Sequence, residues 1–162
     1  MSGALDHLEK PSGASGGEKT LQPEDMLCFE LHAASRAMTA VYRPLLGELG
    51  LTYPQYLVMV LLWGHAPRLV NELGRELELD SGTLSPLLKR LEGSGLILRR
   101  RREADERELE VTLTESGQEL RERARHIPAA IERASNLSPG EMEELVGKLA
   151  GLRSSLHEAA SE

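Results

Sequence analysis

The most reactive side chain in this sequence is the thiol of Cys28, the only cysteine among 162 residues. Peroxides oxidise a thiolate to a sulfenic acid, although a lone cysteine on an amphipathic helix is more often an inert hydrophobic residue. His32 follows four residues later, so the two side chains share one face of a helix. Cys28 is therefore a candidate redox site, with a packed, inert thiol as the alternative.

A second candidate site is the basic segment between Asp80 and Arg102. It carries six basic and two acidic residues, a net charge of +4, whereas the whole chain has a net charge of −7. The overall charge argues against nucleic-acid binding, but salt screens distant charges, so nearby ones decide phosphate contacts. We therefore expect this segment to contact DNA, and a solvated polar surface is the alternative.

Hydrophobic spacing predicts two helices around the cysteine. Apolar residues recur at helical spacing over 24–49, where Pro44 is a site of bending or breaking. A nearly all-apolar, buried helix is expected over 53–64. All five aromatic residues lie between Phe29 and Trp63, which predicts one apolar subcore. A pocket of phenol hydroxyls around the sulfur is the other interpretation.

The middle of the chain reads as two short helices followed by two strands. The first helix covers 69–79, and the second ends near 93–95, with either Ser81 or Ser85 as the cap at its start. Short strands at 96–98 and 109–113 flank a charged arm. This order predicts a winged helix-turn-helix, whose second helix, called the reader helix below, enters the major groove of DNA.

The predicted fold is mainly α with a small β-hairpin wing, flanked by N- and C-terminal dimerisation helices. Later helices are expected over 114–135, kinked at Pro128, and from Ser138 to about 157. Surplus apolar faces on the long helices predict a twofold homodimer that presents two reader helices to successive major grooves.

Domain boundaries follow from the same pattern. A flexible tail is predicted for 1–23, and one domain for 24–162. Within that domain, residues 24–66 form the N-terminal helices that carry the cysteine. Residues 67–113 form the winged helix-turn-helix, and residues 114–159 form the dimerisation helices. Residues 1–24 lack the apolar run of a secretory signal, and no run is long enough to span a membrane. We therefore expect a cytoplasmic protein without a membrane partner.

The reader helix and the wing carry the predicted DNA contacts. Hydroxyl side chains permit close approach to the groove, and basic ones bind phosphate or guanine. Arg107 is the predicted minor-groove contact at the wing tip, with Asp105 fixing the turn or pairing with an arginine. The predicted DNA-binding residues are Ser81, Thr83, Ser85, Lys89, Arg90, Arg99, Asp105 and Arg107.

These residues resemble the MarR family of bacterial transcriptional regulators, and more closely its organic hydroperoxide resistance regulators of the one-cysteine type. The family-wide signals are Asp105-Glu-Arg107 at the wing and Leu113-Thr-Glu-Ser-Gly117 after it. The context of Cys28 together with Tyr53-Pro-Gln-Tyr56 is more specific. The resemblance runs from about 27 to 131, and more loosely to residue 162.

The resemblance implies a homodimeric repressor that binds a palindromic operator in double-stranded DNA while its cysteine is reduced. An organic hydroperoxide would oxidise Cys28, and the repressor would then release DNA. Tyr42 and Tyr53 would hydrogen-bond to the sulfur, although by default they are core aromatic residues. His32 stands where members often have a tyrosine. Without a second cysteine, the sulfenic acid would react with a low-molecular-weight thiol, form a sulfenamide or be overoxidised.

Other functions compete with this interpretation. A MarR-type repressor released by a small aromatic ligand, with Cys28 not involved, keeps the fold and changes the signal. A thiol peroxidase is disfavoured because no arginine–threonine–proline arrangement surrounds the cysteine, and a structural adaptor leaves the basic arm unexplained. The histidines show no metal-ligand spacing, and no catalytic residue, cofactor or metal is expected.

Overall fold

A computed structural model describes residues 22–102 and 105–161, with the backbone alone for 105–107. The chain divides into two compact units, 1–34 and 35–162. In the described part of the first unit, the 3-10 turn η1 (Pro23–Asp25) leads into the opening turns of α1 (Leu27–Gly47), whose later turns belong to the second unit. The predicted tail lies outside the described residues, apart from its last two positions.

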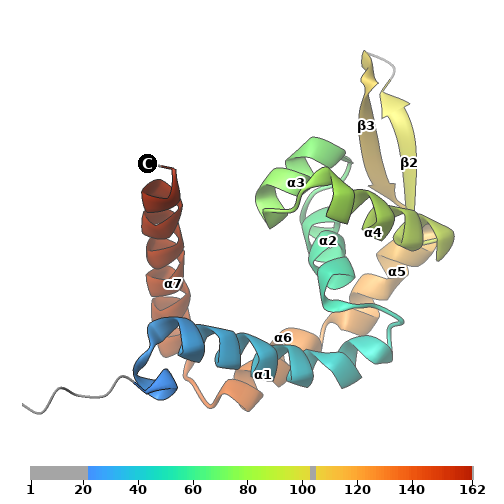
Figure 1. Cartoon of the computed structure of the whole chain (residues 1–162). Coiled ribbons are helices and arrows are strands. Elements are labelled where there is room, and N and C mark those ends of the chain that lie inside the picture. The colour runs from blue at the N-terminus through green and yellow to red at the C-terminus, as the bar shows by residue number, and fades with distance from the viewer. Residues whose placement is uncertain (1–21, 103–104, 162) are drawn as a thin grey trace, which may run out of the picture. The chain divides into compact units, whose positions relative to one another are not determined.

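The second unit contains a winged helix-turn-helix, as predicted (Figure 1). Its helices are α2 (Tyr53–Gly64), α3 (Val70–Leu77), α4 (Ser81–Gly93), α5 (Glu115–Ala124), α6 (Ile127–Ser135) and α7 (Pro139–Ala160). Its strands are β1 (Arg68–Leu69), β2 (Ile97–Arg102) and β3 (Asp105–Leu113). Among the described residues, no helix is long and apolar enough to cross a membrane.

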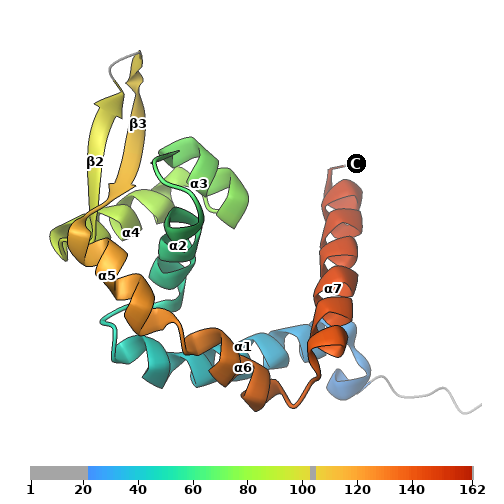
Figure 2. The ribbon, with the colours of Figure 1, turned by 180° about the vertical axis from the view of Figure 1, so that it is seen from behind.

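The wing is an antiparallel sheet of order β1-β3-β2, and its hairpin projects away from α4 in both views (Figures 1 and 2). Ile97 pairs with Leu113 and Arg100 with Glu110, and the register shifts between Arg101 and Arg102. The strands are longer than predicted, because most of the expected charged arm pairs as strand. The two-residue strand β1 was not predicted, since so short a run has no alternating pattern.

The starts of α4 and of α6 differ from the sequence-based expectation. The helix α4 begins at Ser81 after the cap Asp80, so neither Ser81 nor Ser85 is its cap. The single helix expected over 114–135 is two helices that separate at Arg125 and His126. Pro128 lies in the first turn of α6, where its missing N–H is not needed, so it starts a helix instead of kinking one.

One continuous leucine-rich core holds together the winged helix-turn-helix, which we call the reader. The helix α4 buries Leu84, Leu87, Leu88 and Leu91 in a cluster that includes α2 and the wing. Met59 of α2 and Ile97 of β2 are fully buried in the same cluster. Burying an aliphatic side chain of this size stabilises a fold by roughly 1.5–3 kcal/mol. The shared core therefore makes α2, α4 and the wing base one packed body.

The base of the wing packs tightly against the start of α5. The Thr114 hydroxyl donates to the Gly95 carbonyl at 2.6 Å, and the Thr114 N–H donates to the Leu96 carbonyl at 3.1 Å. A Cβ atom at Gly117 would stand only 2.1 Å from that Leu96 carbonyl oxygen. The indole N–H of Trp63, from α2, donates to the Gly117 carbonyl at 2.8 Å. Glycine at 117 is thus required by the close approach of two backbones.

We expect Gly117→Ala to lower the free energy of unfolding by about 1–3 kcal/mol, because the added methyl group meets backbone that cannot rotate away. The matched control is Gly93→Ala in α4, where nothing lies within 4 Å of the added Cβ. Urea denaturation measures both variants. Equal stability of Gly117→Ala and the control would contradict the tight packing at Leu96.

Candidate functional site

The exposed face of α4 gathers the polar residues that the sequence predicted as DNA contacts. Its buried leucines turn one face inward, and Ser81, Thr83, Ser85, Lys89 and Arg90 are all exposed on the remainder. Ser81, Ser85 and Lys89 are spaced four apart and form one row along the helix. The row has short hydroxyl residues near the helix start and cationic residues toward its end, which suits close approach to an anionic groove.

Asp80 fixes the start of this helix, a role that the sequence analysis had assigned to a serine. Its carboxylate accepts hydrogen bonds from the backbone N–H and the hydroxyl of Thr83, both at 2.9 Å. These bonds lower the pKa of Asp80, with the backbone bond contributing most. The spacing Asp80-x-x-Thr83 is the sequence signal for this cap. The Thr83 hydroxyl therefore has its proton engaged, and its lone pairs remain to accept a hydrogen bond.

Two arginines of the wing bind glutamates. The guanidinium of Arg99 bonds Glu92 of α4 at 2.6 and 3.0 Å, and Arg102 bonds Glu108 across the hairpin at 2.7 Å. Hydrogen bonding by Arg99 lowers the pKa of Glu92. Arg100 is exposed. Sequence reasoning missed Glu92 as a partner, because only the fold brings it to Arg99.

The wing-tip predictions remain predictions. Asp105 and Arg107 fall in β3, but their side chains lie outside the described residues. The backbone of Asp105 pairs with that of Arg102 at the end of the hairpin. The two residues therefore lie at the turn-side end of the wing, which is where the sequence placed them.

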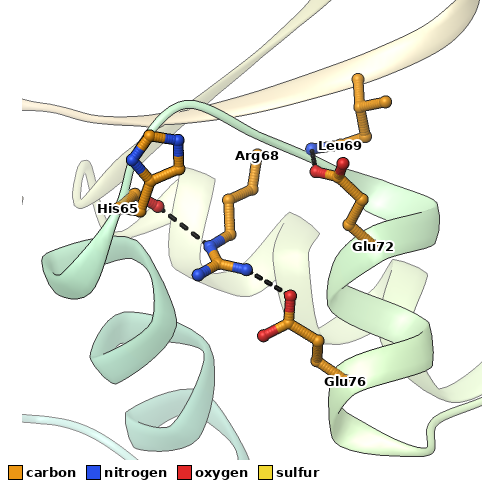
Figure 3. A network of polar contacts seen from close by, with 5 residues as sticks. All are labelled: His65, Arg68, Leu69, Glu72 and Glu76. Carbon is orange, nitrogen blue, oxygen red and sulfur yellow. Dashed lines mark hydrogen bonds and ion pairs between the residues drawn. The ribbon is translucent and has the colours of Figure 1, made fainter.

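A second polar network attaches the other edge of the sheet to α3 (Figure 3). Arg68 donates to the His65 carbonyl at 3.0 Å and forms an ion pair with Glu76 of α3. Glu72 accepts a hydrogen bond from the backbone N–H of Leu69 at 2.9 Å. The network holds the short strand β1 beside the first helix of the helix-turn-helix.

The candidate redox site begins with the thiol of Cys28 and its neighbour on the helix, His32. Cys28 and His32 belong to the first unit, and both side chains are exposed. Cys28 is the second residue of α1. The spacing of four places His32 on the face of α1 that carries the thiol. The thiol is therefore accessible to a soluble oxidant.

The predicted phenol pair belongs to the second unit and is in contact. The rings of Tyr42, from α1, and Tyr53, the first residue of α2, have centroids 4.8 Å apart. The ring centroid of Tyr56 lies 6.0 Å from that of Tyr42 and 6.1 Å from that of Trp63. The sequence-based expectation of one aromatic subcore is thus confirmed for these four residues. Tyr56 and Trp63, which were not predicted as site residues, connect the phenol pair to the contact of Trp63 with Gly117.

Apolar pockets lie on two sides of Tyr42. One, of about 350 Å³, is lined by Tyr42, Tyr53, Leu46, Leu51 and Thr39, among others. Another, of about 420 Å³, lies between Tyr42, α6 and the start of α7. Volumes of this size suit small organic molecules. Among the described residues there is no group of three or more histidine, cysteine or acidic residues that could hold a metal ion.

Comparison with known proteins identifies the family. The family model described as transcriptional regulator SarA/Rot matches residues 40–124, more than half of the chain. The organic hydroperoxide resistance transcriptional regulator of Bacillus subtilis is 48% identical over 135 residues, which are 83% of this chain and 92% of that protein. The chain belongs to the MarR-type winged-helix transcriptional regulators. The resemblance to the organic hydroperoxide resistance regulators is confirmed by this relative.

Solved structures of a MarR-type regulator extend the comparison. AbfR of Staphylococcus epidermidis has been solved reduced and bound to DNA, and overoxidised and bound to DNA. Each of these two structures matches with a TM-score of 0.70 and 38% identity, over 82% of this chain and 93% of the other. The relatives are transcriptional regulators and not enzymes. The chain is accordingly a transcriptional regulator, and the thiol peroxidase interpretation is set aside.

The phenol cluster makes a prediction about alkaline titration. Burial raises the pKa of Tyr42 and of Tyr56, and their phenol neighbours add to the rise. The folded state then holds these protons more tightly than the unfolded state, whose phenols titrate near 10. Their contribution to stability is complete below that pH and is lost as the pH rises above it.

Phenolate absorbance measures this shift. We expect Tyr42 and Tyr56 of the folded regulator to ionise above the midpoint of the urea-unfolded chain. Tyr56→Phe should remove one of these two late titrations. A folded protein whose three phenols ionise together at the unfolded midpoint would contradict the buried cluster.

Proposed function

We propose that this protein is a transcriptional repressor that binds operator DNA through α4 and the wing, senses organic hydroperoxides at Cys28 and releases DNA after oxidation. The observation that carries the proposal is the exposed thiol at the start of α1 in a chain nearly half identical to a hydroperoxide resistance regulator. A polar row on α4 supplies the DNA contacts. The AbfR structures, in which a related regulator is bound to DNA in a reduced and in an overoxidised state, support DNA binding and oxidation but do not bear on release.

In the proposed complex α4 lies in the major groove. Ser81, Thr83 and Ser85 approach the base edges or phosphates, and Lys89 and Arg90 bind phosphate or guanine. The wing tip, with Arg107 and Asp105, reaches the minor groove. The rest of the chain is acidic, which limits non-specific DNA binding to the one basic face.

A homodimer is proposed from the long C-terminal helix. In α7, which spans 22 residues, no residue is buried. Apolar side chains on it are exposed, namely Leu145, Val146, Leu149 and Leu156. A second copy covering this helix would give a twofold arrangement of two reader helices, which matches a palindromic operator.

The proposed thiol site takes its parts from two copies. Tyr42 lies fourteen positions after Cys28, and fourteen steps along an α-helix rise roughly 21 Å, more than two side chains can span. We therefore propose that Tyr42 and Tyr53 of a second copy donate hydrogen bonds to the thiolate. The pocket beside these phenols would hold the apolar part of the hydroperoxide.

The proposed oxidation balances with the peroxide alone. The thiolate attacks the terminal oxygen of the hydroperoxide, the O–O bond breaks, and the departing alkoxide takes a proton to become an alcohol. The sulfur loses two electrons and becomes a sulfenic acid. A low-molecular-weight thiol then displaces water to form a mixed disulfide on Cys28. Either product changes the volume and hydrogen bonding at the phenol pair, and this change would bias the reader away from DNA.

DNA affinity before and after oxidation tests the proposal. We expect organic hydroperoxide to weaken operator binding of the wild-type protein by at least about 100-fold, a change of roughly 2.7 kcal/mol. Cys28→Ser should bind DNA with or without peroxide, since it cannot form a sulfenic acid. Fluorescence anisotropy at fixed salt measures binding, and mass spectrometry identifies the oxidised form. Release of Cys28→Ser by peroxide would refute cysteine sensing.

His32 has a separate test. If its ring assists the thiolate from the same helix face, His32→Ala should slow oxidation several-fold, while His32→Tyr should leave the rate intact. Stopped-flow monitoring of thiol loss with an organic hydroperoxide gives both rates. Equal rates for the wild type and both variants would remove His32 from the mechanism.

A second function is favoured by the pockets around Tyr42. A small aromatic molecule held there would bias the reader with Cys28 uninvolved. In that case Cys28→Ser would ignore peroxide and still release DNA when an aromatic ligand such as salicylate is added. A reader that keeps its DNA with salicylate, and loses it only on oxidation of Cys28, excludes this function.

A further inference from the structure

Strand alternation in β2 separates its arginines into two groups. Ile97 is fully buried, and Arg99, two residues on, faces the same side with its side chain only 20% exposed. Arg100 is on the opposite side and is exposed. Arg99 is thus the arginine of this pair that faces the body of the reader.

The partner of Arg99 is Glu92, in the last turn of α4. One carboxylate oxygen accepts the backbone N–H of Arg99 at 3.1 Å. The other accepts from Nε at 3.0 Å and from a terminal nitrogen at 2.6 Å. Both oxygens of Glu92 are therefore occupied by one residue of the wing, and the guanidinium is held in a charge-assisted contact through two of its nitrogens.

We infer that Glu92 and Arg99 form a clamp that fixes the angle between the wing and the reader helix, so that Arg99 is a positioning residue and not a phosphate contact. The inference deepens the proposed function and rests on it, because it explains how α4 and the wing, the two elements proposed to contact DNA, are held at a fixed angle. It also reassigns Arg99, which the sequence analysis had placed among the DNA-binding residues.

The use of a clamp follows from how the hairpin is attached. Ser94, Gly95 and Leu96 connect α4 to β2, with Gly95 in a left-handed conformation, and the shared core holds only the base of the hairpin, at Ile97 and Val111. The hairpin is long relative to this connection: six residues of strand extend roughly 20 Å, so a tilt of about 10° at the base moves the tip by about 3–4 Å. A displacement of that size would withdraw a side chain from a groove. A second attachment on α4 limits the tilt.

The opposite edge of the sheet is attached in the same way. Arg68 of β1 pairs with Glu76 of α3 (Figure 3). Each helix of the helix-turn-helix thus carries a glutamate that binds an arginine from one outer strand of the three-stranded sheet. By contrast, Arg102 and Glu108 pair within the hairpin and cannot hold it to a helix.

A double-mutant cycle with a charge-matched control tests the clamp. The variants are Arg99→Gln, Glu92→Ala, the double variant, and Arg100→Gln alone and with Glu92→Ala. Arg100→Gln removes the same charge one residue along without touching Glu92. The probe is a labelled duplex selected from a random-sequence library by the wild-type regulator, and affinity is measured across a salt series. Urea denaturation of every variant reports on the fold.

We expect Arg99→Gln and Glu92→Ala each to weaken DNA binding by about 5–10-fold, and the double variant to be no weaker than either single one. The salt dependence of binding should stay unchanged in Arg99→Gln, because no phosphate contact is lost. The effect of Arg100→Gln should be the same with or without Glu92.

Two results would overturn the clamp. In the first, Arg99→Gln costs the same affinity with and without Glu92 and lowers the salt slope by about one, which identifies a phosphate contact. Alternatively, Glu92 and Arg99 couple in unfolding but not in DNA affinity, which identifies a merely stabilising ion pair. A wild-type protein that selects no duplex refutes the proposed DNA binding itself, and so is distinguishable from both.

Discussion

The orientation of the reader depends on burying one face of α4. Four leucines on that face enter a core shared with α2 and the wing, so the helix cannot rotate about its axis without exposing them. The polar row that includes Ser81, Ser85 and Lys89 is presented outward as a consequence. Asp80 then determines where the helix begins, and with it which residue opens the row. Hydrophobic packing thus decides which residues are available to DNA.

Charge has two uses in this regulator, and they are separated by strand geometry. Arg99, on the inward side of β2, forms an ion pair with Glu92, whereas Arg100, on the outward side, is exposed. Counting basic residues along the segment therefore overstates the charge available to phosphates. Glutamates neutralise Arg99 and Arg102 of the wing. The cations of α4, Lys89 and Arg90, remain as exposed charge on the reader helix.

The aromatic residues join the candidate sensor to the reader. Tyr53 begins α2 and Trp63 lies in its last turn, where the indole donates to Gly117 beside the base of the wing. The helix between them is largely buried and packs on α4 through the common core. Contacts through α2 thus connect the phenol pair to the base of the wing.

The sequence by itself determined the helix–helix–hairpin order of the reader, the polar row on α4, the candidate thiol and the aromatic subcore. These follow from local periodicity, capping chemistry and residue type, and the family was recognisable from the residues around Cys28 and Tyr53. Only the tertiary structure decided that Arg99 binds Glu92, that β1 joins the sheet and that Gly117 faces Leu96. Such contacts join residues that are distant in sequence or occupy runs too short to leave a pattern, so no local signal reports them.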